Sequence, residues 1–264
     1  MKVFRLIVAE LTILFLIPLK GYSQSTGIYR DLRGNKYAAI KSRGMLQCKE
    51  EDRSESPTFR CYIQLYKYTS TGQNTEAIKD GNGNDIYVYR TTRHTERKTE
   101  GGCDWKVSKH FIISPDIVNS DGEAKAATMD WATANGYLAT ARTNYYSVPS
   151  FAVPKGCAMY RGKDNLDEPG TWRVPTRGEC ALILMFYKKI EETQAETDFK
   201  PFALSTSDKT SYWAATEKGG NSTGAWYMTF FPDSQIAGYS LEQFYRAKSE
   251  SSYYLRCIRD IPLK

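Results

Sequence analysis

Apolar and polar residues alternate along several short segments of the chain, and this alternation is the period of half-buried β-strands. In residues 59–68 the apolar positions fall on every second residue, at Cys61, Ile63 and Leu65. A second strand is predicted at residues 85–91. We therefore expect a small β-rich region over residues 24–109.

The segment that joins these two strands, residues 79–85, is rich in glycine, asparagine and aspartate. Such a composition favours a tight turn. The alternation of Asp80, Asn82 and Asn84 also fits the start of a calcium loop. An EF-hand would need glycine at its sixth position and an acidic residue at its twelfth, where this chain has Asp85 and Thr91. The turn is the favoured interpretation.

The pattern changes after residue 109. Residues 110–118 read as an apolar strand, and residues 129–141 as a short helix. Asp130 is a plausible N-cap of this helix, because a carboxylate can accept a hydrogen bond from a free backbone N–H of the first turn. Trp131, Ala134 and Leu138 would then share one face.

Residues 171–190 show the clearest local signal. Pro175 ends a predicted strand, and Thr176 with Glu179 has the spacing of a capping box that starts a helix. The positions that follow are apolar at helical spacing and predict one buried face: Cys180, Ile183, Leu184, Tyr187 and Ile190. Cys180 is therefore expected in the first turn, on the side that meets a sheet.

Three further strands are predicted at residues 211–216, 225–231 and 253–260. Turns rich in glycine, serine and asparagine separate them, together with a long segment over residues 232–252. Strands in runs with a few short helices indicate the α+β class.

The first 23 residues have the pattern of a secretory signal peptide. Lys2 and Arg5 precede the apolar run Leu11–Leu19, and small residues stand before a predicted cut at Gln24. An N-terminal membrane anchor is the alternative. We expect an exported protein, located in the periplasm, on the outer cell surface or in the medium, with no transmembrane segment after signal removal.

Net charge argues against one class of partner. Removing the leader, with Lys2, Arg5 and Lys20 against Glu10, lowers the net charge from +6 to +4. Charges of both signs are interspersed, and the densest basic cluster is residues 93–98. A nucleic-acid-binding protein would need a concentrated basic face, so we expect no nucleic-acid partner.

All 6 cysteines lie after the predicted cut. An even number behind a signal peptide indicates disulfides, and six cysteines allow 15 pairings. Cys48 and Cys61 flank a polar loop that they could close. Clustered Cys/His spacing is missing from the sequence, so we expect no metal and no cofactor.

Four motifs in this order resemble bacterial extracellular domains of the C-type-lectin-like superfold. They are Trp172–Thr176 (WRVPT), Tyr212–Thr216 (YWAAT), Ala225 with Trp226, and Leu255–Arg259 (LRCIR). The most similar families are the FISUMP-type major paralogous domains and the C-terminal domains of collagen-like adhesins and some fimbrial tip proteins. The resemblance covers residues 111–264 and implies a C-type-lectin-like domain over 110–264, with two helices, small antiparallel sheets and long loops.

The resemblance also implies a disulfide pairing. In this superfold a disulfide commonly joins a helix to the final strand, a role that Cys180 and Cys257 fit. With Cys48–Cys61 as the local pair, Cys103–Cys157 would remain as the third bridge.

Candidate ligand-binding residues lie in the long segment before the last strand. Aromatic and amide side chains on a loop of a rigid scaffold are suited to ligand recognition. In this segment they occur together with charged residues. The candidate set is Tyr239, Glu242, Gln243, Phe244, Tyr245 and Arg246. The same residues could instead pack the loop onto the domain. Trp172, Trp213 and Trp226 are interpreted as core. The triplets of calcium-dependent sugar binding are missing from the sequence.

Catalysis is not expected. His94 and His110 are the sequence's histidines, and neither lies in a recognisable catalytic signature. Adjacent carboxylates such as Asp167 with Glu168, or Glu191 with Glu192, are interpreted as exposed loop or helix-end charges rather than a glycosidase pair. A formylglycine-generating enzyme of the same superfold would need a reduced, reactive cysteine.

The sequence thus predicts a secreted or surface-displayed, non-catalytic binding or adhesion module for a glycan, a matrix component or a protein. The alternative is a fimbria-associated or envelope structural subunit that packs against fimbrial neighbours. An enzyme of the formylglycine-generating type is a third, less favoured hypothesis.

Overall fold

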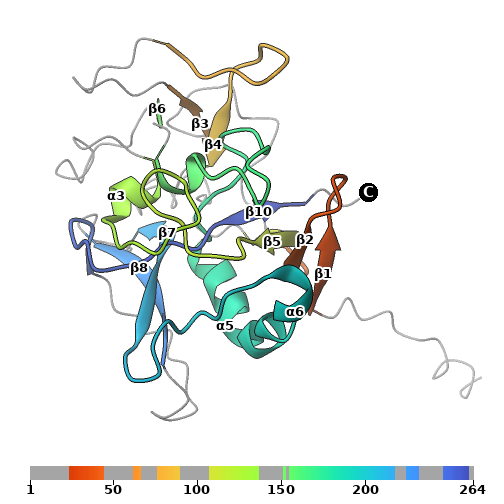
Figure 1. The fold of residues 1–264 in the computed structure, drawn as a ribbon. Helices are drawn as coiled ribbons and strands as arrows, with labels where there is room; N and C mark the ends of the chain where they lie inside the picture. Colours follow the sequence, from red (N-terminus) through yellow and green to blue (C-terminus); the bar gives the residue numbers. More distant parts are fainter. Residues whose placement is uncertain are drawn as a thin grey trace, which may run out of the picture.

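The chain combines three small sheets with a few helices, which is an α+β arrangement (Figure 1). The computed structural model describes residues 24–44, 62–66, 76–89, 107–136, 151–152, 155–217, 224–231 and 246–261. The strands are β1 (Ser25–Arg30), β2 (Lys36–Lys41), β3 (Tyr62–Leu65), β4 (Tyr87–Tyr89), β5 (His110–Ile113), β6 (Phe151–Ala152), β7 (Thr210–Glu217), β8 (Gly224–Phe230), β9 (Arg246–Ala247) and β10 (Ile258–Asp260). The helices are α3 (Trp131–Ala134), η3 (Gly156–Ala158), α5 (Arg177–Glu191) and α6 (Gln194–Thr197).

The sheet in the order β1-β2-β5-β10, here called the main sheet, joins both ends of the chain. All three of its strand pairs are antiparallel, with Ala39 opposite Ile112 and Arg259 opposite the same isoleucine. The main sheet therefore crosses the boundary that the sequence analysis placed between residues 109 and 110. A second sheet has the order β4-β3-β6, in which β3 and β6 are parallel, and a third has the order β7-β8-β9.

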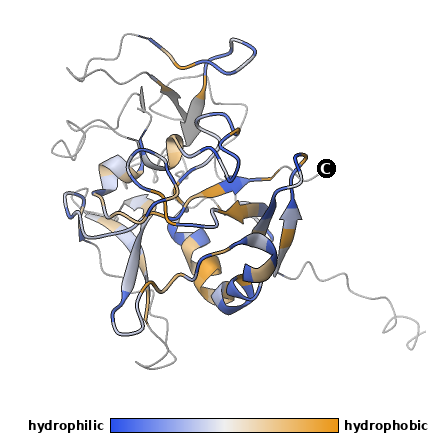
Figure 2. Cartoon of the chain, in the orientation of Figure 1, coloured by the Kyte–Doolittle hydropathy of each residue, from blue (hydrophilic) through white to orange (hydrophobic). Residues whose placement is uncertain are grey.

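One face of the main sheet, here called the α5 side, packs on the apolar face of α5. Ala38, Ile40 and Phe111 from the sheet belong to the same buried cluster as Ile183 and Ile190 from the helix. Figure 2 shows apolar residues on α5 and on the neighbouring strands of the main sheet. Burial of these side chains is the main favourable term that holds helix and sheet together.

The opposite face of the main sheet, here called the disulfide side, packs on aromatic residues. Tyr37, Ala39 and Ile112 from the sheet join Tyr160 and Trp172 in a second buried cluster. The rings of Tyr160 and Trp172 meet edge to face with their centroids 4.9 Å apart, a favoured geometry for aromatic pairs.

The predicted helix starts are confirmed. Glu179 N–H donates to Thr176 Oγ1 at 3.3 Å and Thr176 N–H donates to Glu179 Oε2 at 2.9 Å, which completes the capping box of α5. Asp130 caps α3 by accepting from Thr133 N–H at 2.8 Å. Helix α3 is shorter than expected, with four residues, and Leu138 lies outside the described residues.

The predicted turn at residues 79–85 is also confirmed. Asp80 Oδ1 accepts hydrogen bonds from the backbone N–H groups of Asn82 and Asn84, both at 2.9 Å. These bonds, those from Asn84 first, lower the pKa of the Asp80 carboxyl. The carboxylate therefore stabilises the turn itself, as expected for an Asx turn.

The terminal segment differs from the expectation. Cys257 forms a disulfide with Cys157, with an S–S distance of 2.08 Å, and Cys180 is a buried free thiol. The predicted pairs Cys180–Cys257 and Cys103–Cys157 are therefore wrong. Cys48, Cys61 and Cys103 lie outside the described residues, so the pair Cys48–Cys61 stays a prediction.

Cys257 does not pair with Cys180 because side chains alternate between two faces along an extended segment. Leu255 and Cys257 belong to the cluster on the disulfide side, whereas Ile258 belongs to the cluster on the α5 side, together with Cys180. The helix spacing placed Cys180 correctly, on the buried face of α5. Cys257, however, points away from that helix.

Arg256 is fully buried on the α5 side, where backbone carbonyls accept from its guanidinium. Its guanidinium donates to four backbone carbonyls, those of Ser114, Pro115, Lys200 and Pro201, over distances of 2.8–3.1 Å. It also lies 4.7 Å from the ring of Phe199 and 5.1 Å from that of Phe202. This cation therefore joins the terminal segment to two loops.

Two tryptophans connect the third sheet to α3. Trp131 Nε1 donates to the carbonyl of Ala214 at 2.9 Å, and Trp213 Nε1 donates to that of Met129 at 2.8 Å. Trp172 and Trp213 are fully buried, which confirms the core interpretation for both. Trp226 is partly buried under the guanidinium of Arg177, which lies 3.8 Å from its ring. Across the described ranges, no helix is long and apolar enough to span a membrane.

Candidate functional site

The structure places one of the six candidate ligand-binding residues. Arg246 begins β9, at the margin of the third sheet, and its side chain is exposed. Tyr239, Glu242, Gln243, Phe244 and Tyr245 lie outside the described residues, as does His94. The site can therefore be built from Arg246 outwards.

Arg246 lies beside a group of aromatic residues, and we call Arg246, Tyr253, Tyr227 and Trp213 the Arg246 cluster. The Tyr253 ring is 4.4 Å from the Trp213 ring and 4.8 Å from the Tyr227 ring, centroid to centroid. Hydrogen bonds with the hydroxyls of Tyr253 and Tyr227 raise the pKa of Arg246. The guanidinium is thus a permanent, oriented charge in front of buried rings.

Strand pairing explains why these residues meet. Trp213 lies directly opposite Tyr227 in the β7–β8 pair, and Arg246 lies opposite Ala225 in the β8–β9 pair. Ala225 and Tyr227 are two positions apart and therefore point to the same face. Tyr253 belongs to the terminal segment, which is held in this place by a β-bridge between the backbones of Tyr253 and Met129.

A second cation of the same segment is buried rather than exposed. Lys248 is 3% exposed, and its Nζ lies 4.5 Å from the centroid of the Trp131 ring. Its backbone carbonyl accepts a hydrogen bond from Trp131 N–H at 3.0 Å. Lys248 therefore anchors the segment, whereas Arg246 is exposed to solvent.

The Arg246 cluster combines an exposed guanidinium with tyrosine hydroxyls. A guanidinium offers planar, forked donors that suit carboxylate, sulfate or phosphate groups. Burial raises the pKa of Tyr253, so its hydroxyl stays protonated near neutral pH. Such a surface can bind anionic groups or hydroxyl-rich ligands.

Asp167 is a buried functional group that the sequence analysis misjudged. It was interpreted as an exposed loop charge, but it is 5% exposed and accepts from Trp172 Nε1, Arg259 Nη1 and Arg33 Nη2 at 2.7, 2.7 and 2.5 Å. Its neighbour Glu168 is exposed, as was expected. Two of these partners, Arg33 and Arg259, come from distant parts of the chain, 134 and 92 residues away, so the local pattern did not indicate the burial of Asp167.

The backbone around Asp167 is adapted to this arrangement. Gly162 has a φ of +78°, and a Cβ at this position would lie 2.6 Å from Asp167 Oδ2. Glycine is needed here both for the left-handed backbone and for the close approach. We assign this network a structural role, because Asp167 is buried and its hydrogen bonds join Arg33 and Arg259 from the two ends of the chain.

A second ionic network surrounds the start of α5. Arg173 forms a forked pair with Glu179, with both N–O distances 2.7 Å, and a further bond with Asp260 at 2.7 Å. Burial opposes the charged form of Arg173, but the carboxylates of Asp260 and Glu179 hold its pKa well above the ordinary value. The same carboxylate of Glu179 completes the capping box, so this network too is structural.

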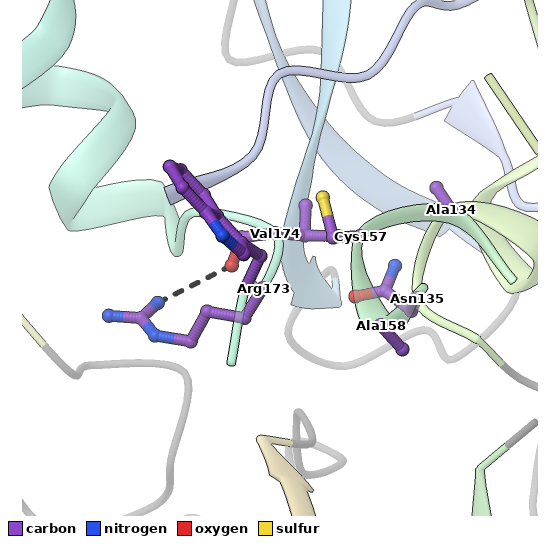
Figure 3. Close-up of a pocket in the computed structure, with 7 residues that line it drawn as sticks. Ala134, Asn135, Cys157, Ala158, Arg173 and Val174 are labelled. Carbon is purple, nitrogen blue, oxygen red and sulfur yellow. Dashed lines mark hydrogen bonds between the residues drawn. The ribbon is translucent and has the colours of Figure 1, made fainter. Parts of the chain in front are cut away.

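A small cavity lies beside the disulfide and has a volume of about 10 Å³. Figure 3 shows part of its lining, with Cys157 beside Val174 and the Arg173 side chain extending away from Cys157, its Nη1 bonded to the Val174 carbonyl. This volume is that of about one water molecule. The cavity is therefore too small for a substrate.

The described cysteines do not resemble catalytic thiols. Cys257 and Cys157 are bonded to each other, and burial raises the pKa of the Cys180 thiol far above its ordinary value. A nucleophilic cysteine needs exposure and a lowered thiol pKa. Among the described residues, no group of three or more His, Cys, Asp or Glu side chains is arranged to hold a metal ion.

Comparisons with protein-family models, with curated proteins and with solved structures found no match to this chain.

Proposed function

We propose that this protein is an exported, non-catalytic binding or adhesion module that recognises a glycan, a matrix component or a protein through the Arg246 cluster. In this proposal the part of the chain from residue 110 onwards is a C-type-lectin-like domain. The four sequence motifs support that assignment, as does the mixed arrangement of small sheets and few helices. Export is supported by the predicted signal peptide and by the disulfide between Cys157 and Cys257.

The observation that carries the proposal is the position of Arg246. It is exposed at the sheet margin, Tyr253 and then Tyr227 raise its pKa, and it directly follows the aromatic and amide-rich residues 239–245. A fixed cation beside tyrosine hydroxyls loses little conformational freedom on binding, because it is already oriented. We expect the ligand to present a carboxylate, a sulfate or a dense set of hydroxyls to this guanidinium.

Glycan and matrix-protein arrays, probed with the mature chain, test this proposal. Arg246→Ala should weaken binding to any ligand found by about tenfold or more, which is about 1.4 kcal/mol. Lys189→Ala is the matched control, because it removes one exposed positive charge from α5 and is 66% exposed. Binding that is unchanged in Arg246→Ala, or equally reduced in both variants, would contradict the role of the Arg246 cluster.

A structural subunit of a fimbria or envelope assembly is the second candidate. The observation in its favour is the strand β1, which has another strand on one side only within the described part of the chain. Isolation of the protein from its native host in a complex with pilus subunits, with no array ligand, would favour this alternative.

A further inference from the structure

Strand β1 forms an open edge of the main sheet. It pairs with β2 from Ser25 opposite Lys41 to Arg30 opposite Lys36, and no described strand lies on its other side. Figure 1 shows β1 at the margin of the molecule, with α5 and α6 on one face of the sheet only. The other end of the sheet is less open, because Ile258 of β10 also bridges to Arg173.

The hydrogen-bond alternation shows which backbone groups of β1 do not bond β2. Asp31 N–H donates to the carbonyl of Asn35 at 2.9 Å, so the pair 31/35 is hydrogen-bonded, and alternate pairs back along the hairpin are bonded as well. The bond from Ser42 N–H to the carbonyl of Lys109 agrees with this alternation. Counted back from Ser42, every second residue of β2 points its N–H and C=O groups towards β5, and the residues in between point theirs towards β1. The N–H and C=O groups of Thr26, Ile28 and Arg30 therefore point away from β2, towards the open edge.

A hollow lies next to this edge. It has a volume of about 230 Å³ and is lined by all six residues of β1 together with Ala39, Lys41 and His110. Ser25, Gly27 and Tyr29 point to the same face as these three residues, because directly paired residues share a face. The hollow is therefore on the disulfide side of the main sheet, opposite α5.

Gly27 makes the hollow accessible from the edge. A Cβ built on Gly27 would have no atom within 4 Å, so the space above this residue is open. Tyr29 and His110, whose rings meet edge to face at 5.7 Å, form one wall. A side chain from a strand placed beside β1 would lie over Gly27, at the usual distance between cross-strand neighbours.

The charges that line the hollow are of one sign. Arg30 and Lys41 are cationic, His110 can become so, and none of the residues that line the hollow is acidic. Lys41 lies in β2 opposite Ser25, the first residue of β1, and points to the face of the hollow, whereas Arg30, the last residue of β1, points to the other face. A strand added beside β1 has side chains on both faces, so these two positive charges favour a partner with negative charges near both of its ends.

We infer that β1 is a docking edge for an extended acidic segment of a partner protein, which adds a strand to the main sheet and places one apolar side chain over Gly27. In strand addition, main-chain hydrogen bonds supply affinity, and pockets for alternate side chains supply specificity. Here the main-chain groups are those of Thr26, Ile28 and Arg30, and the pocket is the hollow over Gly27. This surface is separate from the Arg246 cluster.

A display library of random peptides of about ten residues, the upper range of strand lengths, tests this inference with the mature full chain as bait. Selected peptides should be acidic and should alternate apolar and polar residues. Ile28→Pro removes a free edge N–H without removing a bond to β2, and proline is tolerated on such edges. It should weaken binding of the synthetic peptides by about tenfold or more, whereas Ile28→Val should leave binding unchanged.

A second variant tests the hollow. Gly27→Phe fills the open space and keeps every backbone group, so it should also weaken the peptides about tenfold. Circular dichroism and thermal unfolding establish that the variants are folded, and Arg246→Ala should bind the peptides like the unmodified chain. Failure to select any acidic peptide, or full binding to folded Ile28→Pro, would overturn the inference. A dimer of the unmodified chain that Ile28→Pro converts to a monomer would overturn it as well, because the occupant would then be a second copy.

Discussion

The two sides of the main sheet are held by different interactions. On the α5 side, an apolar helix face covers Ala38, Ile40 and Phe111, and the cysteine among them is a free thiol. On the disulfide side, aromatic rings pack around Trp172, the Cys157–Cys257 bridge crosses the cluster, and Asp167 receives three side-chain hydrogen bonds. Both sides therefore bury charged groups, since the α5 side holds Arg256 and the Arg173–Glu179 pair, but the covalent bond lies on the disulfide side.

This difference follows from the lengths of the elements. Helix α5 has 15 residues and offers a continuous apolar stripe, which is sufficient to cover one sheet face. The described elements on the other side are short, since α3 has four residues and η3 has three. Short elements bury little apolar area. Cross-links and charge-assisted hydrogen bonds therefore supply a larger share of the stability of these elements.

Removing the disulfide should have the largest effect. The double variant Cys157→Ala/Cys257→Ala opens a loop with a sequence separation of 100 residues, and the chain-entropy model gives about 4.7 kcal/mol for such a loop. Guanidinium denaturation followed by circular dichroism measures the loss. Peptide mapping without reduction should recover Cys157 joined to Cys257.

The free thiol supplies the matched measurement on the α5 side. Cys180 should resist alkylation in the folded protein and react after unfolding, since it is fully buried and its thiol pKa is raised. A small stability loss in the double cysteine variant, or rapid labelling of Cys180 in the native state, would show that the two sides do not differ as described.

Neutralising Glu179 should cause the next largest loss in the free energy of unfolding, because it weakens the α5 side. Glu179→Gln leaves the buried Arg173 with a weaker partner, and breaking a buried ion pair costs about 3 kcal/mol or more. The control on the same helix is Glu192→Gln, whose pair with Lys189 is 60% exposed on the glutamate side and should contribute about 0.5 kcal/mol or less. Equal denaturation midpoints for the two variants would refute the structural role of the buried pair.

The stability of the disulfide side should depend on pH through His110. This should be the smallest of the three stability effects, after the disulfide and Glu179. Burial, and then the charge of Lys41, lower the pKa of His110 below its ordinary value of about 6.5. The unfolded chain therefore binds a proton at higher pH than the folded one, and stability should fall as the pH drops below about 6.5. His110→Gln should flatten this part of a stability profile measured by urea denaturation, and an unchanged slope would exclude the histidine as its source.

Local patterns predicted the local structure well. The start of α5 was evident because Thr176 and Glu179 interact with each other across a single turn. The turn at Asp80 was evident for the same reason, since its acceptor and donors lie within five residues. Short-range chemistry of this kind is encoded in adjacent positions and needs no knowledge of the rest of the chain.

Long-range contacts were predicted poorly. The alternation along residues 255–258 could have shown that Cys257 and Ile258 point to opposite faces, but it could not show which face α5 covers. Asp167 and Arg33 meet across 134 residues, and nothing near either residue indicates the contact. The same holds for the Arg246 cluster, where Arg246 was proposed but its partners Tyr227 and Tyr253 were not.

The position of Arg256 has a consequence for the order of folding. Its guanidinium donates a hydrogen bond to the carbonyl of Ser114, 142 residues away, and donates to carbonyls of two loops at the same time. A charged side chain cannot leave water until these acceptors are assembled, so both loops must be in place before the terminal segment docks. We expect the main sheet to close late, by a slow step with high contact order. While β10 is undocked, β5 presents a second open edge, and a chain held at this stage would be most prone to pair with another copy.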